Sequence, residues 1–434
     1  MLRRRDLTPP TITRGYARYV LALLFVAYVF NFIDRQILAI LLQPIKNELQ
    51  VSDSAMGLLT GIAFALFYTF AGIPIARLAD RRSRRTIIAV GLTAWRALTA
   101  ASGLARSFAQ LALLRVGVGV GEAAFVPPSH SLLADYFPIE RRATAMAIFS
   151  MGVHVGLAFG FLVGGWVGQI FGWRAAFMVV GLPGLVVAIT VRMTVHEPTR
   201  GHADGAHPSH PGRGAHDVER IGAAMRVLWS LRSFRHLALA AAFTAFGGYA
   251  NAIWGPTFFV RVHGMTIGQL GTWLGAILGI GGGIGAILGG VLADRLGRRD
   301  ARAQLYVPAI AAVAQLPFAI ATLFWPTSYG ALLFFIPPAI ASAMWFGPVF
   351  SLTQTLVRPT MRATTSAVLG FVINLIGLGL GPLAVGVLND ALAVSYGALA
   401  IRYSLLAVSV SNIVAAAFFL AAARHIRTDL ADRR

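Results

Sequence analysis

Asp34, Arg115 and Glu122 are ionisable residues inside apolar stretches of this sequence. Arg115 and Glu122 interrupt the glycine-rich run LLRVGVGVGEAAF at residues 113–125, and Asp34 interrupts an apolar run from about 19 to 42. Seven residues make about two turns of helix, so Arg115 and Glu122 lie on one helical face. A carboxyl group away from water can load and release a proton, and a guanidinium can bind an anion through two parallel hydrogen bonds. These residue types predict proton transfer beside an anion-binding site.

The composition places these charges in a membrane. Of 434 residues, 57% are hydrophobic and 12% are charged, with a mean hydropathy of +0.70. Soluble proteins carry about twice that charged fraction. The net charge of +20 would also suit nucleic-acid binding, but the basic residues fall between apolar spans. Because cysteine is absent, disulfides and thiolate metal sites are excluded. We expect an integral membrane protein with membrane lipids, and no nucleic acid, around it.

Twelve apolar stretches are long enough to span a bilayer, which takes about 20 residues. Arginine collects in alternate loops and in both tails, so the positive-inside rule predicts that both termini are cytoplasmic. Lys46 is the only lysine, and this arginine bias favours a bacterial inner membrane as the location of the multi-pass chain. The first span is too long for the apolar region of a cleavable signal peptide. The predicted spans are 18–42, 55–79, 86–105, 108–133, 143–169, 174–195, 235–260, 267–293, 303–325, 329–356, 363–388 and 399–423.

A polar segment divides the chain into two halves. Residues 196–220, HEPTRGHADGAHPSHPGRGAHDVER, are rich in glycine, proline and histidine and have no apolar period, which is typical of a linker. The predicted organisation is an N-terminal six-helix bundle at 1–195, a cytoplasmic linker at 196–234 and a C-terminal six-helix bundle at 235–434. A solvated linker is favoured over a metal site, so we expect no bound metal. The histidines concerned are His196, His202, His207, His210 and His216.

The two halves repeat each other. ARLADRRSRR at 76–85 matches GVLADRLGRR at 290–299, which begins 214 residues later. RATAMAI from Arg142 matches RATTSAV from Arg362, 220 residues later. Two matches at nearly one offset indicate a duplication, as in transporters built from two related bundles.

These features resemble the major facilitator superfamily, whose loop pattern is G-x-x-x-D-R-x-x-R-R. The second copy fits it from Gly290 to Arg299, whereas the first has Ala76 in place of the glycine. The resemblance implies an all-α integral membrane fold, with twelve transmembrane helices in two pseudo-symmetric six-helix bundles. It also implies alternating access, with these loops favouring the outward-facing state. The expected conformational gate residues are Asp80, Arg81, Arg84, Arg85, Asp294, Arg295 and Arg298.

Within the superfamily the chain is similar to the Spinster type, on NFIDRQ at 31–36, RVGVGVGEA at 115–123 and RATTSAVLGFVINLIGLGLGP at 362–382. This similarity implies a lipid-like anionic substrate, such as a lysophospholipid or a sphingoid phosphate. We expect Asp34 and Glu122 to couple transport to protons. The predicted substrate-binding residues are Arg115, Glu122, Asp34, Asn31, Asn374, Tyr249 and Trp254, with Asn251 a further candidate for the cavity wall.

Helix geometry predicts a specific ion pair. At 1.5 Å per residue, Asp34 lies about 24 Å from the cytoplasmic end of its span. Arg115 lies about 10 Å from the opposite surface, level with Asp34, and Glu122 lies about 10 Å deeper. We therefore expect Asp34 to pair with Arg115. A static ion network is the structural alternative, and the role of Arg96 stays open.

Other functions were weighed against this prediction. An uncoupled or proton-coupled carrier of small organic anions or drugs is the first alternative. An intramembrane enzyme is disfavoured because the spans contain neither H-E-x-x-H nor G-x-S-x-G, and an ATP-driven pump is disfavoured because no phosphate-binding G-x-x-x-x-G-K-[ST] occurs. We therefore expect a monomeric transporter, not an enzyme, that uses a proton as coupling ion and no other cofactor.

Overall fold

The computed structural model describes residues 13–200, 202–204, 221–358 and 361–431, and the described elements are helices. The N-terminal half contains α1 to α8. Their bounds are α1 Arg14–Ile40, α2 Leu42–Leu49, α3 Asp53–Thr60, α4 Ile62–Arg81, α5 Arg84–Ser102, α6 Phe108–Glu122, α7 Val126–Tyr136 and α8 Ile139–Thr194.

The C-terminal half repeats this arrangement. It follows the short helices η1 His202–Asp204 and α9 Ile221–Ser230, both of which lie inside the predicted linker. Its elements are α10 Arg232–His263, α11 Ile267–Gly297, α12 Ala303–Phe324, α13 Ser328–Ala341, α14 Phe346–Thr355, α15 Arg362–Val372, η3 Ile373–Leu380, α16 Gly381–Tyr396, η4 Gly397–Leu399, α17 Ala400–Ser409 and α18 Ser411–Ala431.

Nine described helical stretches are long and apolar enough to cross a membrane. Two of them each hold two predicted spans. The stretch at 140–194 contains Gly172, whose φ of 83° breaks α8 into two helices, and the stretch at 364–431 turns at Gly397, where φ is 54°. Helix α5 is not among the nine, because it carries Arg84, Arg85 and Arg96. The structure therefore accommodates all twelve predicted spans.

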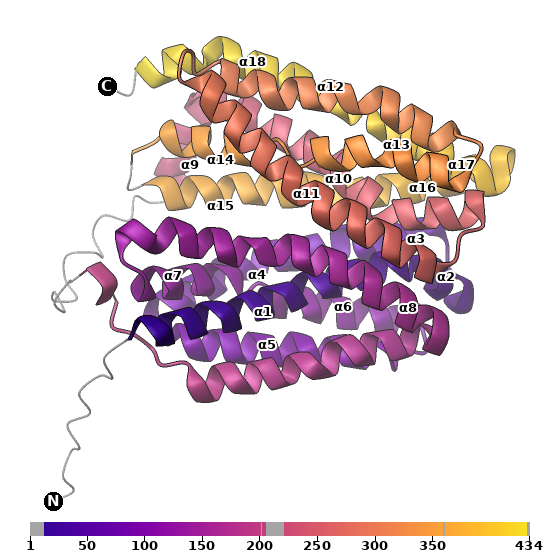
Figure 1. Cartoon of the computed structure of the whole chain (residues 1–434), viewed down its shortest axis with the longest axis horizontal. Helices are drawn as coiled ribbons and strands as arrows, with labels where there is room; N and C mark the ends of the chain where they lie inside the picture. The colour runs from indigo at the N-terminus through magenta and orange to yellow at the C-terminus, as the bar shows by residue number, and fades with distance from the viewer. Residues whose placement is uncertain (1–12, 201, 205–220, 359–360, 432–434) are drawn as a thin grey trace, which may run out of the picture.

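The helices form two side-by-side bundles (Figure 1). Helix α1 begins and α18 ends at the same end of the molecule, which we call the terminus side; the opposite end, with α2, α3 and α17, is the far side. Contacts between the halves follow two seams. Helix α8 packs on α11, and the α3–α4 pair packs on α16 and η3.

Glycines make both seams narrow on the far side. A Cβ at Gly61 would lie 2.4 Å from the Gly379 carbonyl oxygen, and one at Gly271 would lie 2.4 Å from the Phe161 carbonyl oxygen. Side chains larger than hydrogen would push these helices apart. Outside the seams the surface is apolar, as at Leu113 and Met193, which are 73% and 76% exposed. This surface suits lipid contact.

Candidate functional site

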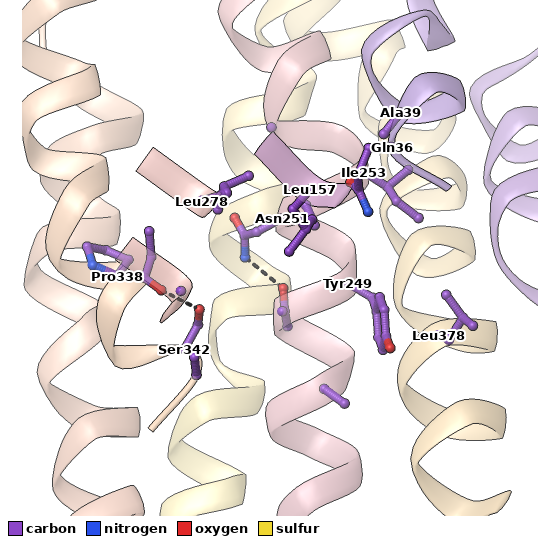
Figure 2. A pocket seen from close by; sticks show the side chains of 18 of the residues that line it. Gln36, Ala39, Leu157, Tyr249, Asn251, Ile253, Leu278, Pro338, Ser342 and Leu378 are labelled. Carbon is purple, nitrogen blue, oxygen red and sulfur yellow. Dashed lines mark hydrogen bonds between the residues drawn. The ribbon is translucent and has the colours of Figure 1, made fainter. Parts of the chain in front are cut away.

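A cavity of about 300 Å³ lies between the two halves. Helices α1, α4, α6 and α8 supply one wall, and α10, α11, α12, α13 and α18 supply much of the other. Figure 2 shows side chains from both halves around this space, among them Gln36, Tyr249, Asn251 and Ser342. Because neither bundle encloses the space alone, its shape depends on how the bundles are arranged.

Asp34 is fully buried beside this cavity, and it pairs with Arg96. One carboxylate oxygen accepts from Arg96 Nη1 at 3.0 Å, and the other accepts from Trp95 Nε1 at 3.1 Å and from Thr99 Oγ1 at 3.3 Å. The predicted Asp34–Arg115 pair is therefore wrong. Three donors from α5 occupy the Asp34 carboxylate.

Arg96 itself fits because its neighbours leave room for it. A Cβ at Gly184 would lie 2.1 Å from Arg96 Cδ, and the Arg96 guanidinium lies 4.9 Å from the centre of the Phe30 ring. The glycine and the aromatic face together accommodate a fully buried guanidinium. The role left open for Arg96 is thus partly answered: it neutralises Asp34.

Glu122 pairs with Arg35, a residue that we did not single out from the sequence. Arg35 Nε and Nη2 lie 2.9 and 2.8 Å from the same oxygen, Glu122 Oε2. The other oxygen, Oε1, is buried and has no hydrogen-bond partner among the described residues. Arg35 also lines the cavity, so this pair connects the cavity wall to the interior of the N-terminal half.

Arg115 differs from Arg35 and Arg96, which form ion pairs with Glu122 and Asp34. It lines the cavity, is 3% exposed, and lies over the Phe64 ring at 5.5 Å. Its Nε and Nη1 have no hydrogen-bond partner within the described part of the chain. A buried guanidinium without a partner carries a large desolvation cost, which an anion in the cavity would offset.

The other predicted substrate-binding residues divide into two groups. Tyr249 lines the cavity. Asn31 and Trp254 are buried outside the wall; the Asn31 amide has no described partner, and Trp254 Nε1 donates to the Pro382 carbonyl at 2.8 Å. The hydrogen bond from Trp254 holds α10 against α16. Asn374 lies in η3, also outside the wall.

Hydrogen bonds and ion pairs between the halves gather on the far side. Asp53 lies 2.5 Å from Lys46 Nζ and binds two nitrogens of Arg261 at 2.5 and 2.7 Å. The Asp390 carboxylate accepts from the backbone amides of Asp53 and Ser54, at 3.0 and 2.7 Å. Along the other seam, Trp166 Nε1 donates to Thr272 Oγ1 at 2.9 Å. These contacts hold the two halves together on the far side.

Asp53→Asn is expected to increase the population of molecules with an open far side by about tenfold. The reason is that Lys46 and Arg261 both lose their negatively charged partner. The natural chain has no cysteine. Spin labels therefore attach only to cysteines that are introduced. Suitable positions are the exposed Leu58 on α3 and the exposed Val394 on α16. The measurement is the label-to-label distance distribution, which should gain a longer component.

Glu48→Gln is the matched control, since Glu48 pairs with Arg174 on the same side but within one half, and the pair is solvent-exposed. Exposed pairs contribute little. If both variants gave the distance distribution of the natural chain, the Asp53 contacts would have no role in closure.

The terminus side holds a second charged cluster. Arg84 is 1% exposed; it binds Asp135, and its Nε lies 2.8 Å from Glu197 Oε1. Burial would raise the pKa of Glu197, but hydrogen bonds from the Arg85 amide, Arg84 and Ser83 outweigh it and hold the pKa below its usual value. This cluster joins α5, α7 and the segment after α8 within the N-terminal half.

The remaining predicted gate residues are more open. Arg81 is exposed, and the side chain of Asp80 lies outside the described residues. Asp294 and Arg295 are exposed on α11, and Arg298 is exposed directly after its last residue. The described ion pair near this second copy joins Asp300 to Arg427 at 2.8 Å. Of the linker histidines, His207, His210 and His216 lie outside the described residues.

This fold and its central cavity define a transporter of two related bundles, and sequence comparison gives the family. The profile of the Major Facilitator Superfamily matches residues 24–382. The chain belongs to this superfamily.

Within the superfamily, the chain is similar to Spinster proteins. A bacterial homolog of the human lysosomal transporter Spinster, solved in an inward-facing and unoccupied conformation, superposes with a TM-score of 0.87 at 33% identity, over 96% of this chain and 99% of that one. A Mycolicibacterium smegmatis MFS-type efflux pump is 32% identical over 93% of this chain and 92% of its own. The Danio rerio sphingosine-1-phosphate transporter SPNS2 is 27% identical over 84% and 74%.

Proposed function

We propose that the protein is a proton-coupled secondary transporter that moves a lipid-like anion by alternating access. The observation that carries the proposal is Arg115, a buried guanidinium at the cavity wall whose Nε and Nη1 find no partner in the described residues. Arg35 and Arg96 are neutralised by Glu122 and Asp34, so Arg115 is the cation available to a substrate. An anionic headgroup would bind it through two hydrogen bonds.

An apolar tail would suit much of the remaining wall. Phe32, Phe64, Leu157, Phe258 and Phe335 line the cavity together with other apolar side chains. Burial of apolar area on these residues would stabilise a bound tail. The relative in Danio rerio, named as a sphingosine-1-phosphate transporter, supports the same substrate class.

Proton coupling rests on the Arg35–Glu122 pair. Protonation of Glu122 would remove the charge that holds Arg35 and would free that guanidinium for the cavity. A second anion-binding group would then appear when the proton binds, and would be withdrawn when it leaves. Asp34 is the other candidate carboxyl group, but it already accepts from three donors.

Orientation and gating complete the proposal. The arginine-rich loops support a cytoplasmic terminus side, in a bacterial inner membrane. Opening the far side would break the Asp53 contacts, and the arginines of the two repeated loops would then latch the terminus side. Because one chain supplies both walls of the cavity, a monomer suffices, with a proton as coupling ion and no other cofactor.

A carrier of small organic anions or drugs is the second candidate. Polar residues on the C-terminal wall, such as Asn251 and Gln315, favour it, since a plain acyl tail would leave them unpaired. The Mycolicibacterium smegmatis efflux pump, which matches nearly the whole chain, favours it also.

The full chain in liposomes tests the proposal, with oleoyl lysophosphatidate and gluconate as alternative radiolabelled substrates. A gradient of one pH unit should drive about tenfold accumulation per coupled proton, and a protonophore should abolish it. Flux of either anion that is equal with and without the gradient would contradict proton coupling. Uptake no greater than in protein-free liposomes for both anions would contradict the anion proposal as a whole.

A further inference from the structure

The polar residues of the C-terminal cavity wall share one bonding pattern. Asn251 Nδ2 donates to the Gly247 carbonyl at 2.9 Å, and Gln315 Nε2 donates to the Ala311 carbonyl at 3.1 Å. Each amide nitrogen is thus bound to its own helix, four residues back. Both residues line the cavity, and neither side-chain oxygen accepts a described hydrogen bond.

The hydroxyl groups of this wall behave in the same way. Each donates to a backbone carbonyl of its own helix, and therefore keeps its lone pairs for another partner. These bonds are Thr244 Oγ1 to Ala240 at 2.8 Å, Thr322 Oγ1 to Phe318 at 2.8 Å, Ser342 Oγ to Ala339 at 2.9 Å and Ser409 Oγ to Leu405 at 2.8 Å. Figure 2 shows the Asn251 and Ser342 bonds beside the cavity.

The two amides lie on helices that share a neighbour, since α10 and α12 both pack on α18. Asn412 on α18 also lines the cavity, and a Cβ built on Gly247 would lie 3.7 Å from its Oδ1. Asn251 and Asn412 therefore both lie close to Gly247. The C-terminal wall holds amide side chains from three helices, and those on α10 and α12 have their nitrogens bound to backbone carbonyls.

The opposite wall presents donors. Arg115 and Arg35 lie there, and their guanidinium groups can only donate. A ligand bound across the cavity thus meets donors at one end and acceptors at the other. Acceptors favour a ligand hydroxyl or N–H group, and a ligand without one would leave them unpaired.

We infer that Asn251, Gln315 and Asn412 form a donor-selecting subsite, so that the transported anion carries hydroxyl or N–H groups at the end opposite its charge. This inference rests on the proposed function and narrows its substrate class. Two sources share this chemistry: a small polyhydroxy acid, or a lipid-like anion whose chain ends in a hydroxyl group.

Two pairs of probes test the inference by competition binding to the purified full chain in detergent. Gluconate is compared with hexanoate, and 16-hydroxyhexadecyl phosphate with hexadecyl phosphate. The hydroxylated member of at least one pair should bind about 5- to 10-fold more tightly, the effect of about one hydrogen bond. The pair that shows the preference identifies the source.

Substitutions test which residues cause the preference for the hydroxylated anion. Asn251→Leu and Gln315→Met should each reduce the ratio of the two affinities, because the hydroxylated anion loses an acceptor and the hydroxyl-free anion no longer leaves one unpaired. Gln354→Met is the matched control, because Gln354 is an exposed amide outside the cavity wall whose Nε2 lies 3.4 Å from Ser366 Oγ.

The outcomes separate this inference from the proposed function. Equal binding within both pairs, or a preference that survives both variants, would overturn the subsite and leave anion transport standing. Absence of binding for all four anions, or binding that Arg115→Ala leaves unchanged, would overturn the proposed function and the subsite with it.

Discussion

Arg115→Ala is expected to weaken binding of the transported anion by about 100-fold and to abolish its uptake at low concentration. Arg115 lines the cavity with two nitrogens that have no partner in the described part of the chain, so the variant loses about two charge-assisted hydrogen bonds to the anion, each contributing about 1.5 kcal/mol. Competition binding to purified protein measures the affinity, and initial rates in liposomes measure uptake.

Arg115→Lys separates charge from geometry. A lysine keeps the positive charge but cannot form two parallel hydrogen bonds, so about one tenth of the affinity should remain. Arg106→Ala is the control, because Arg106 is an exposed arginine just before α6 and outside the cavity wall. If Arg115→Ala bound the anion as well as Arg106→Ala, Arg115 would not be a substrate ligand.

The fold was predictable from the sequence because the bilayer imposes it. Length and hydropathy identify the spans, and loop arginines assign them to sides. The repeated loops at 76–85 and 290–299 then indicated two related bundles. Hydropathy does not predict the turns inside the long helical stretches, which Gly172 and Gly397 form through their positive φ values.

The ion pairing was only partly predictable. Rise per residue gives the depth of a side chain but not the direction in which it points. Asp34 and Arg115 were assigned similar depths, yet Asp34 faces α5 and binds Arg96. A signal for this was present in Gly184, since its missing side chain leaves space for Arg96, but only the packed structure shows which residue fills that space.

Uncharged residues in the spans and charged residues near the loops gave the weakest sequence signals for a functional role. Gln315 and Asn412 are neutral, and single amides are tolerated in apolar helices when they bond to their own backbone, as Gln315 does. Asp53, Lys46 and Arg261 lie in or beside the loops between predicted spans. Charged residues are common there, so their positions carry no specific signal for an ion cluster. Their association depends on how α2, α3 and α10 meet, which no local pattern encodes.

Glu122→Gln is expected to uncouple transport from the pH gradient while leaving exchange of anion across the membrane active. Glutamine keeps the shape of a protonated glutamate, and Arg35 should then stay free of its present partner. A gradient of one pH unit, which should drive about tenfold accumulation in the natural chain, should drive none in the variant. The measurement is steady-state uptake with and without the gradient, beside anion counterflow without it.

Asp34→Asn supplies the comparison that assigns the proton to one carboxyl group. Asp34 is held by Arg96, Trp95 and Thr99, and its loss leaves Arg96 buried without a counter-charge. Breaking a buried pair in this way destabilises a protein by about 3–5 kcal/mol, so Asp34→Asn should lower the melting temperature. Glu122 differs because its Oε1 has no partner among the residues that the structure describes, and because Arg35, its cation, lines the cavity. A Glu122→Gln protein that still accumulated anion in proportion to the gradient would transfer the coupling role to Asp34.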